Sequence, residues 1–205
     1  MTKFFTPFVA LAFLLGGSST ALATPILESI SPIPTNFTFG FGNDFLLMTG
    51  TGLGDVTARV QAVDLNVPYS GLTTSGCEAA DFAGFAQGSI ALIQRGGCNF
   101  SDMAANAQAA GAAGVIIFNE GNAPSRFALY SGNLLPFTAN IPVFSTSFQL
   151  GDFLRNGILH GDTTFTVRMA VTREDLVSAP EPATITLLGL GLVGLVRSRR
   201  LGRRR

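Results

Sequence analysis

The sequence predicts an α/β fold, in which a sheet of short strands packs against a few short helices. Two apolar runs, residues 89–94 and 115–118, are short and lie next to glycines, as buried strands usually do. Between them, residues 101–110 are rich in alanine and have high helix propensity. A strand, a helix and a second strand at this spacing predict a βαβ unit with parallel strands and a right-handed crossover.

Alternating apolar and polar residues before this unit predict further strands at residues 37–41, 44–49 and 56–63. In the last of these, one face would carry Val56, Ala58, Val60 and Ala62. Within the βαβ unit, Ser101 is a plausible helix N-cap and Gly111 a plausible stop. Small residues, Ala104, Ala107 and Gly111, would form the packing face of the helix.

Three more elements are expected after the βαβ unit. Residues 141–145 form another apolar run that predicts a strand. Residues 148–155 predict a short helix that Gly157 would cap, and residues 163–171 alternate as a final strand. The sheet is thus expected to extend on both sides of the βαβ unit.

The central motifs resemble the protease-associated (PA) domain family. They comprise Gly76-Cys77, GSIALIQRGGCNF at 88–100, NAQAAGAAGVIIFNEG at 106–121, and Ile141-Pro142-Val143. The similarity is greatest to the PA domains of secreted zinc aminopeptidases. It implies an α/β fold with a curved, partly closed, barrel-like sheet and short flanking helices. One departure is Asp102-Met103, where family members often carry a lysine early in the helix.

The resemblance also implies a non-catalytic function, because PA domains accompany peptidases and sorting receptors and bind peptide or protein substrates or restrict access to them. The candidate ligand contacts are Arg95, at the end of a strand, and Arg126 and Tyr130, in the polar loop 119–133. For Arg95 we favour a structural role over ligand contact: it would bond backbone carbonyls or a carboxylate in the adjacent loop.

The chain has two cysteines, Cys77 and Cys98, and an oxidising compartment would allow them to form a disulfide. Two free buried thiols are the alternative. The chain has a single histidine, His160, which we expect to be a solvated turn residue. We therefore predict no catalytic residues, no metal and no cofactor. A secreted hydrolase or peptidase-derived accessory protein with an unrecognised site, or a structural matrix component, remains the alternative.

The formal net charge of zero conceals an uneven distribution. Seven of the 13 basic residues lie near the two ends, whereas all 13 acidic residues lie between Glu28 and Glu181. The part between the ends therefore has a net charge of about −7. Nucleic-acid binding requires a basic surface, so we do not expect it.

Residues 1–23 have the features of a secretory signal peptide: Lys3, an apolar run and a closing Ala-Leu-Ala. Signal peptidase is expected to cleave between Ala23 and Thr24. An uncleaved N-terminal anchor is the alternative.

The C-terminus combines Pro180-Glu181-Pro182 with an apolar stretch at 183–196 and six arginines at 197–205. The arginines would hold the end of the chain in the cytoplasm. These features resemble the PEP-CTERM sorting signal of bacterial exported proteins, which implies processing by an exosortase. A permanent membrane anchor is the alternative, so membrane contact through the apolar helix is either transient or permanent.

The predicted organisation has six segments: a signal peptide (1–23), a β-rich segment (24–54), a PA domain (55–172), a linker with the Pro-Glu-Pro motif (173–182), a short hydrophobic helix (183–196) and an Arg-rich tail (197–205). The expected destination, after export across the inner membrane, is the cell surface, outer envelope or extracellular matrix of a Gram-negative bacterium.

Overall fold

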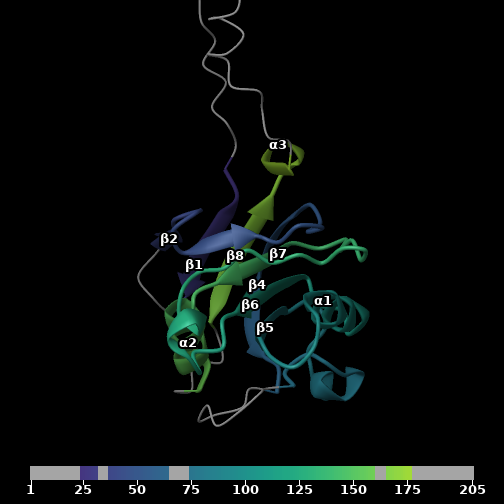
Figure 1. The fold of residues 1–205 in the computed structure, drawn as a ribbon. Coiled ribbons are helices and arrows are strands. Elements are labelled where there is room, and N and C mark those ends of the chain that lie inside the picture. Colours follow the sequence, from purple (N-terminus) through teal and green to yellow (C-terminus); the bar gives the residue numbers. More distant parts are fainter. Residues whose placement is uncertain (1–23, 32–36, 65–73, 160–164, 177–205) are drawn as a thin grey trace, which may run out of the picture.

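The computed structural model describes residues 24–31, 37–64, 74–159 and 165–176. Eight strands form one mixed sheet in the order β2-β1-β8-β4-β5-β6-β7-β3 (Figure 1). The strands are β1 (Ile26–Ser31), β2 (Phe37–Phe39), β3 (Phe45–Leu47), β4 (Gly54–Ala62), β5 (Ile90–Gln94), β6 (Gly114–Phe118), β7 (Val143–Thr146) and β8 (Thr166–Val171). The helices are α1 (Phe100–Ala109), α2 (Phe148–Leu159) and α3 (Arg173–Leu176), with 3-10 turns η1 (Ala79–Phe82) and η2 (Pro124–Arg126). The predicted α/β class is confirmed.

Strands β4 to β7 form the parallel part of the sheet. Strands β5 and β6 pair parallel and are joined through α1, which confirms the predicted βαβ unit. Every residue of these two strands is buried. Continuous apolar runs of this kind are typical of parallel strands that are covered on both faces.

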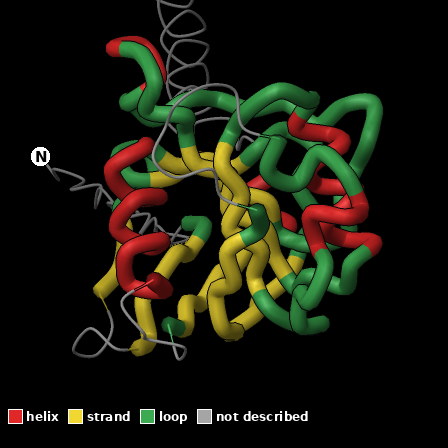
Figure 2. The backbone as a smooth tube through the Cα atoms, turned by 90° about the horizontal axis from the view of Figure 1, so that it is seen from below, coloured by secondary structure: helices red, strands yellow, loops and turns green. Residues whose placement is uncertain are grey.

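Side chains that alternate along the strands separate two hydrophobic cores. In β5, Ile90 and Leu92 belong to one core together with residues of α2, whereas Ala91 and Ile93 belong to the other together with residues of α1. Figure 2 shows helices on both sides of the strands. The small buried side chains of Ala104 and Ala107 let α1 lie close to the sheet, as predicted.

The sheet curls because two neighbouring segments of the chain form its opposite ends. Strands β2 and β3 are consecutive in the chain, yet they are the first and last strands of the sheet. Phe39 and Phe45 pack in the same core, and Phe41 forms an isolated bridge with Phe45. In the turn between them, the Asp44 carboxylate accepts a hydrogen bond from the Gly40 amide at 2.7 Å. The expected curved, partly closed sheet is thus present.

The antiparallel part of the sheet joins the N-terminal segment to the C-terminal strand. Strand β8 lies between β1 and β4, so the β-rich region at 24–54 shares the sheet of the following domain. Arg168 on β8 makes a bidentate contact with Asp55 on β4, at 2.9 and 2.7 Å. These hydrogen bonds from Arg168 hold the pKa of Asp55 below its usual value.

Two predicted helix boundaries are wrong. The N-cap of α1 is Asn99, whose backbone is extended, so Ser101 lies inside the first turn. Helix α2 continues through Gly157 to Leu159 instead of ending there. A Cβ atom at Gly157 would lie 2.9 Å from the ring of Phe165, so this glycine allows close packing rather than capping the helix. Gly111, with φ of +82°, ends the α1 region as predicted.

Several predicted features lie outside the described residues. They are the signal peptide up to Ala23, His160, the motif Pro180-Glu181-Pro182, the apolar stretch at 183–196 and the Arg-rich tail at 197–205. Within the described ranges, no helix is both long and apolar enough to cross a membrane.

Candidate functional site

A cavity of about 520 Å³ lies where β5 and β6 end. The two strands are parallel, so Arg95 and Asn119, the residues that follow them, emerge at the same edge of the sheet. Crevices outside the carboxyl ends of parallel strands are common ligand sites in α/β folds. The residues that line the cavity include Arg95, Phe100, Ser101, Glu120, Arg126 and Leu135.

Arg95 is held against two aromatic rings. Its guanidinium carbon lies 4.8 Å from the centre of the Tyr130 ring and 5.3 Å from that of Phe100. The two rings stack on each other with their centres 5.4 Å apart. Such cation–π contacts fix the plane of a guanidinium without using its hydrogen-bond donors. One donor, Nη1, makes a long 3.4 Å bond to the side-chain oxygen of Asn119.

The structural role that the sequence favoured for Arg95 required backbone carbonyls or a carboxylate as its partners. Among the described residues, the ion pairs involve Arg126, Arg155 and Arg168, and none involves Arg95. Its hydrogen-bond partner is a neutral amide. Arg95 therefore brings to the cavity a positive charge that no carboxylate in the described ranges balances within salt-bridge distance.

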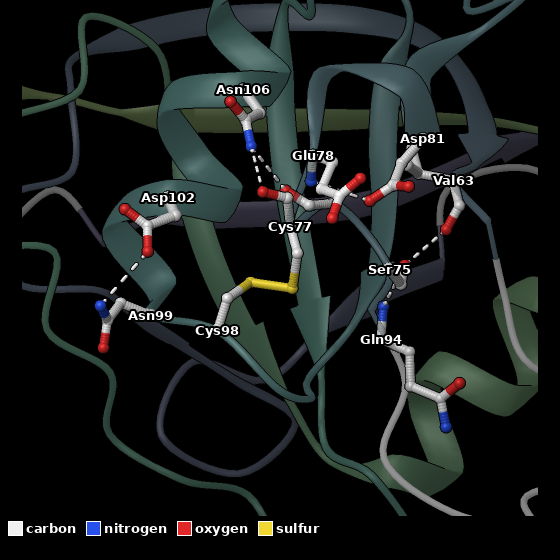
Figure 3. The surroundings of a disulfide bond; sticks show 11 residues. Val63, Ser75, Cys77, Glu78, Asp81, Gln94, Cys98, Asn99, Asp102 and Asn106 are labelled. Atoms are coloured by element: carbon white, nitrogen blue, oxygen red, sulfur yellow. Dashed lines mark hydrogen bonds between the residues drawn. A yellow bond between two sulfur atoms is a disulfide. The ribbon is translucent and has the colours of Figure 1, made fainter.

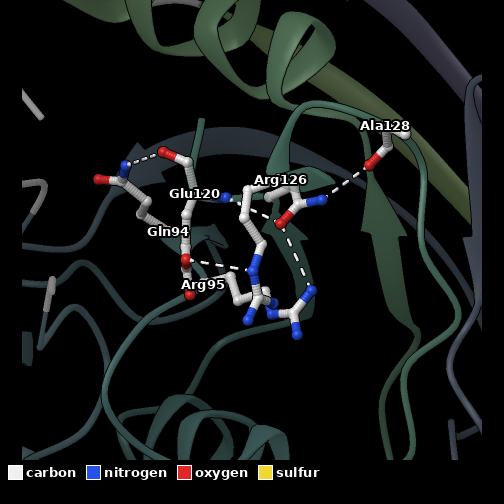
Figure 4. Close-up of polar contacts among 6 residues, drawn as sticks. Gln94, Arg95, Glu120, Arg126 and Ala128 are labelled. Atoms are coloured by element: carbon white, nitrogen blue, oxygen red, sulfur yellow. Dashed lines mark hydrogen bonds and ion pairs between the residues drawn. The ribbon is translucent and has the colours of Figure 1, made fainter. Parts of the chain in front are cut away.

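Arg126 reaches the same cavity from η2. Its Nε atom lies 3.7 Å from Oε2 of Glu120. The Glu120 side chain is 9% exposed and that of Arg126 is 37% exposed, so Glu120 is the more buried partner of the ion pair. A backbone hydrogen bond of 2.9 Å from the Gly121 amide to the Arg126 carbonyl closes this loop. Figure 4 shows the ion pair between Arg126 and Glu120, with Arg95 in the same view.

Tyr130 supports the cavity rather than lining it. Its hydroxyl donates a 3.1 Å hydrogen bond to the carbonyl of Ile117, and its own carbonyl accepts one from the Ser145 hydroxyl at 2.7 Å. Burial raises the pKa of Tyr130 well above its usual value, although the nearby charge of Arg95 opposes this shift. The hydroxyl is therefore already engaged and neutral, and the ring positions Arg95.

A disulfide joins Cys77 to Cys98 beside the cavity, with 5.7 Å between the Cα atoms (Figure 3). Cys98 also lines the cavity. The side-chain amide of Asn106, on α1, donates hydrogen bonds to the carbonyls of Gly76 and Cys77, at 3.1 and 2.8 Å. The segment before η1 is thus attached to Cys98, just before α1, by the disulfide, and to α1 itself by two hydrogen bonds.

The three predicted contact residues therefore have different positions. Arg95 and Arg126 come together at one cavity, whereas Tyr130 packs behind Arg95. Leu135 was missed, and Glu120 was not singled out within the loop 119–133 that was expected to contact a ligand. Glu120 had a sequence signal, because it is a charged residue two positions after a buried strand, but nothing in the sequence around Leu135 distinguished it.

The charged groups of the cavity come from few residues. Its charged lining residues are two arginines and one carboxylate, which Arg126 contacts. Acid–base hydrolysis of a glycoside needs a pair of carboxylates. In the part of the chain that the structure describes, His, Cys, Asp and Glu side chains form no group of three or more that could hold a metal ion.

The fold and the cavity define a small α/β domain with a cationic recess at the ends of its parallel strands. Residues 56–154 match the family model described as "PA domain", and residues 178–200 match the "PEP-CTERM protein-sorting motif". The chain thus contains a PA domain followed by a PEP-CTERM motif, as the sequence resemblance indicated. This combination marks a bacterial exported protein.

The similar proteins are peptidases. An aminopeptidase of Pseudomonas aeruginosa is 48% identical over 120 residues, which are 58% of this chain and 22% of that protein. A PII-type proteinase of Lacticaseibacillus paracasei is 40% identical over 95 residues, 46% of this chain and 5% of the proteinase. The solved aminopeptidase from Aneurinibacillus sp. strain AM-1 aligns with a TM-score of 0.52 and 26% identity, over 74% of this chain and 31% of that one. The chain therefore spans about a fifth of the length of the Pseudomonas relative.

Proposed function

We propose that this exported protein binds peptides or proteins non-catalytically through the cavity beside Arg95 and Arg126. The observation that carries the proposal is the convergence of these two arginines, from separate loops, on a recess of about 520 Å³. Recesses of this size at the ends of parallel strands accommodate small ligands and short chain segments. The similarity to peptidases supports a peptide-like ligand, since it falls on this domain.

The sorting motif supports a surface location for this binding activity. In this proposal, signal peptidase cleaves between Ala23 and Thr24, and an exosortase-type enzyme then processes the chain near Pro180-Glu181-Pro182. The protein would remain at the surface, in the outer envelope or in the extracellular matrix of a Gram-negative cell. Intact-mass spectrometry of the surface-exposed protein tests this: we expect Thr24 at the N-terminus and loss of Arg205. A surface-exposed protein that retains Arg205 would contradict processing.

Capture of partners from the native cell surface tests the binding function. The Ser101→Phe variant places a ring at a residue that lines the cavity, whereas Thr57→Phe places one at an exposed position on β4. We expect partners held by the wild-type protein to be lost with Ser101→Phe and kept with Thr57→Phe. Equal capture by both variants, with both folded by circular dichroism, would refute the assignment of binding to this cavity.

The names of the relatives favour one second candidate function, that of an accessory module for a separate peptidase. The observation behind it is that two aminopeptidases and a proteinase share this region. In that case, the partner captured through the cavity would itself hydrolyse peptides. Peptidase activity in the captured fraction, and none in the purified chain, would support this role.

A further inference from the structure

Building on the proposed binding function, we infer that the cavity anchors its ligand by a free carboxylate, that of a peptide C-terminus, between Arg95 and Arg126. The inference goes beyond peptide binding because it specifies the chemical group that is recognised and the end of the peptide that enters. It depends on the charges, donors and apolar surface of the cavity.

The distribution of charge is the first support. Six arginines lie in the described residues, although the part of the chain between its ends carries many more acidic than basic residues. Arg155 forms an ion pair with Asp152, and Arg168 forms one with Asp55, so the positive charges of these two arginines are locally neutralised. Two of the remaining four line one cavity together with a single carboxylate, Glu120. The recess is locally cationic on an otherwise acidic protein and therefore attracts anions.

The donor geometry is the second support. The rings of Tyr130 and Phe100 hold the guanidinium of Arg95 in place, while its hydrogen bond to the neutral amide of Asn119 is long. Arg126 uses Nε toward Glu120, and its side chain remains more than a third exposed. Planar guanidinium groups match the geometry of a carboxylate and can bind it with two parallel hydrogen bonds. The pair can therefore receive a carboxylate from two sides.

The start of α1 adds to the attraction of an anion. Its N-cap residue, Asn99, makes no side-chain capping bond. Instead, the side-chain amide of Asn99 donates a hydrogen bond of 3.2 Å to the carboxylate of Asp102. Phe100 and Ser101, in the first turn, line the cavity. Uncapped first-turn amides and the positive end of the helix dipole favour a negative group.

The apolar wall indicates a chain terminus rather than an isolated anion. Leu135 lines the cavity with 54% of its surface exposed, and Pro136 lies next to it. An apolar side chain on the last residue of a peptide can cover Leu135 while the carboxylate meets the arginines. The volume of about 520 Å³ is in the range of sites for small ligands, which suits a short peptide tail rather than a folded surface.

Peptide binding to the full-length chain in mild detergent tests the inference. The probes are three pools of N-acetylated tetrapeptides: one ends in leucine with a free carboxylate, one ends in leucine amide, and one ends in aspartate amide. Binding is measured by equilibrium dialysis with mass spectrometry. We expect the free-carboxylate pool to bind at least about tenfold more tightly than the leucine amide pool, the factor expected for one hydrogen bond to a charged group. Equal binding of these two pools, or binding of the aspartate amide pool as tight as that of the free acid, would overturn the inference.

Arginine variants locate the effect. Arg126→Gln should lose about tenfold in affinity for the free-carboxylate pool and little for the amide pool. Arg59→Gln removes the same charge at an exposed position on β4 and should behave like the wild-type protein. Arg95→Gln also disturbs the aromatic packing. Arg126→Gln is the decisive variant, because no aromatic ring in the described part of the chain makes a cation–π contact with Arg126. Equal losses with Arg126→Gln and Arg59→Gln would contradict the inference.

These experiments separate the inference from the function on which it rests. If surface partners are captured through the cavity but the free acid and the amide bind equally, binding stands and carboxylate recognition is wrong. If Ser101→Phe captures partners as well as Thr57→Phe does, and no pool binds, both are wrong.

Discussion

Removing the disulfide by the double change Cys77→Ala and Cys98→Ala should destabilise the protein by about 3 kcal/mol. The bond closes a loop with a sequence separation of 21 residues. In the chain-entropy model, a cross-link of this length removes about 3 kcal/mol of conformational freedom from the unfolded chain at 25 °C. The native structure should change little, because Asn106 still ties the same segment to α1 through two hydrogen bonds.

Urea denaturation of the oxidised protein and of the double variant measures this difference. Circular dichroism follows unfolding, and the free energy is obtained by linear extrapolation to zero urea. A loss below about 1 kcal/mol would refute the reasoning, because the entropy of a loop this long should not be so small.

The variant Asn106→Ala distinguishes the unfolded state from the native state as the origin of the effect. If the disulfide acts through the unfolded chain, its loss and the loss of Asn106 should add to within about 0.5 kcal/mol. If it acts by holding the native segment beside α1, the two losses should be strongly non-additive. We expect additivity.

Two further predictions concern the packing around the site. Burial raises the pKa of Tyr130, so stability should be complete below about pH 10, the ordinary tyrosine pKa, and should fall as the pH rises above it. Tyr130→Phe should remove that alkaline loss, but should lower stability at pH 7 by about 1 kcal/mol because the hydrogen bond to Ile117 is lost. Urea midpoints between pH 7 and 11 measure the alkaline loss and the cost at pH 7. An unchanged alkaline loss in the variant would contradict its assignment to Tyr130. Gly151→Ala should destabilise by about 1–3 kcal/mol, because its Cβ would overlap the buried ring of Phe118, whereas the exposed Gln149→Ala should change stability by less than about 0.5 kcal/mol. Thermal melts compare these two, and equal melting temperatures would count against the packing shown here.

The parts of the fold that could be predicted from sequence are those set by local pattern. Buried parallel strands consist of nearly continuous apolar residues. The short apolar runs of β5 and β6, which lie next to glycines, could therefore be recognised as strands. The alternation of β4 likewise indicated a strand with one face inward. The curl of the sheet could not be derived from periodicity, because it depends on β2 and β3 occupying opposite ends.

Helix boundaries were predicted less well because tertiary contacts decide them. Glycine commonly ends helices, so Gly157 suggested a helix stop. In the structure it lies inside the helix, where the ring of Phe165 leaves no room for a Cβ atom. Ser101 is a good capping residue by type, but the extended backbone that precedes the helix is at Asn99. In both cases the residue type suited a helix end, but the residue lies inside the helix in the structure.

The candidate site was predictable only where it is local to a strand end. Arg95 follows β5 directly, so its place at the sheet edge could be anticipated. Arg126 and Leu135 reach the cavity through the long loop between β6 and β7, whose path sequence periodicity does not determine. Tyr130 was expected to contact ligand, but its hydroxyl binds Ile117 and its ring supports Arg95.

The most direct test of the account is the footprint of a native surface partner on the protein, measured by hydrogen–deuterium exchange of the free and bound chain. Binding through the cavity predicts slower exchange at residues 95–102 and 119–136, which contain the residues that line it. Slower exchange confined to β1, β8 and β4, around Arg168, with residues 95–102 unchanged, would contradict it.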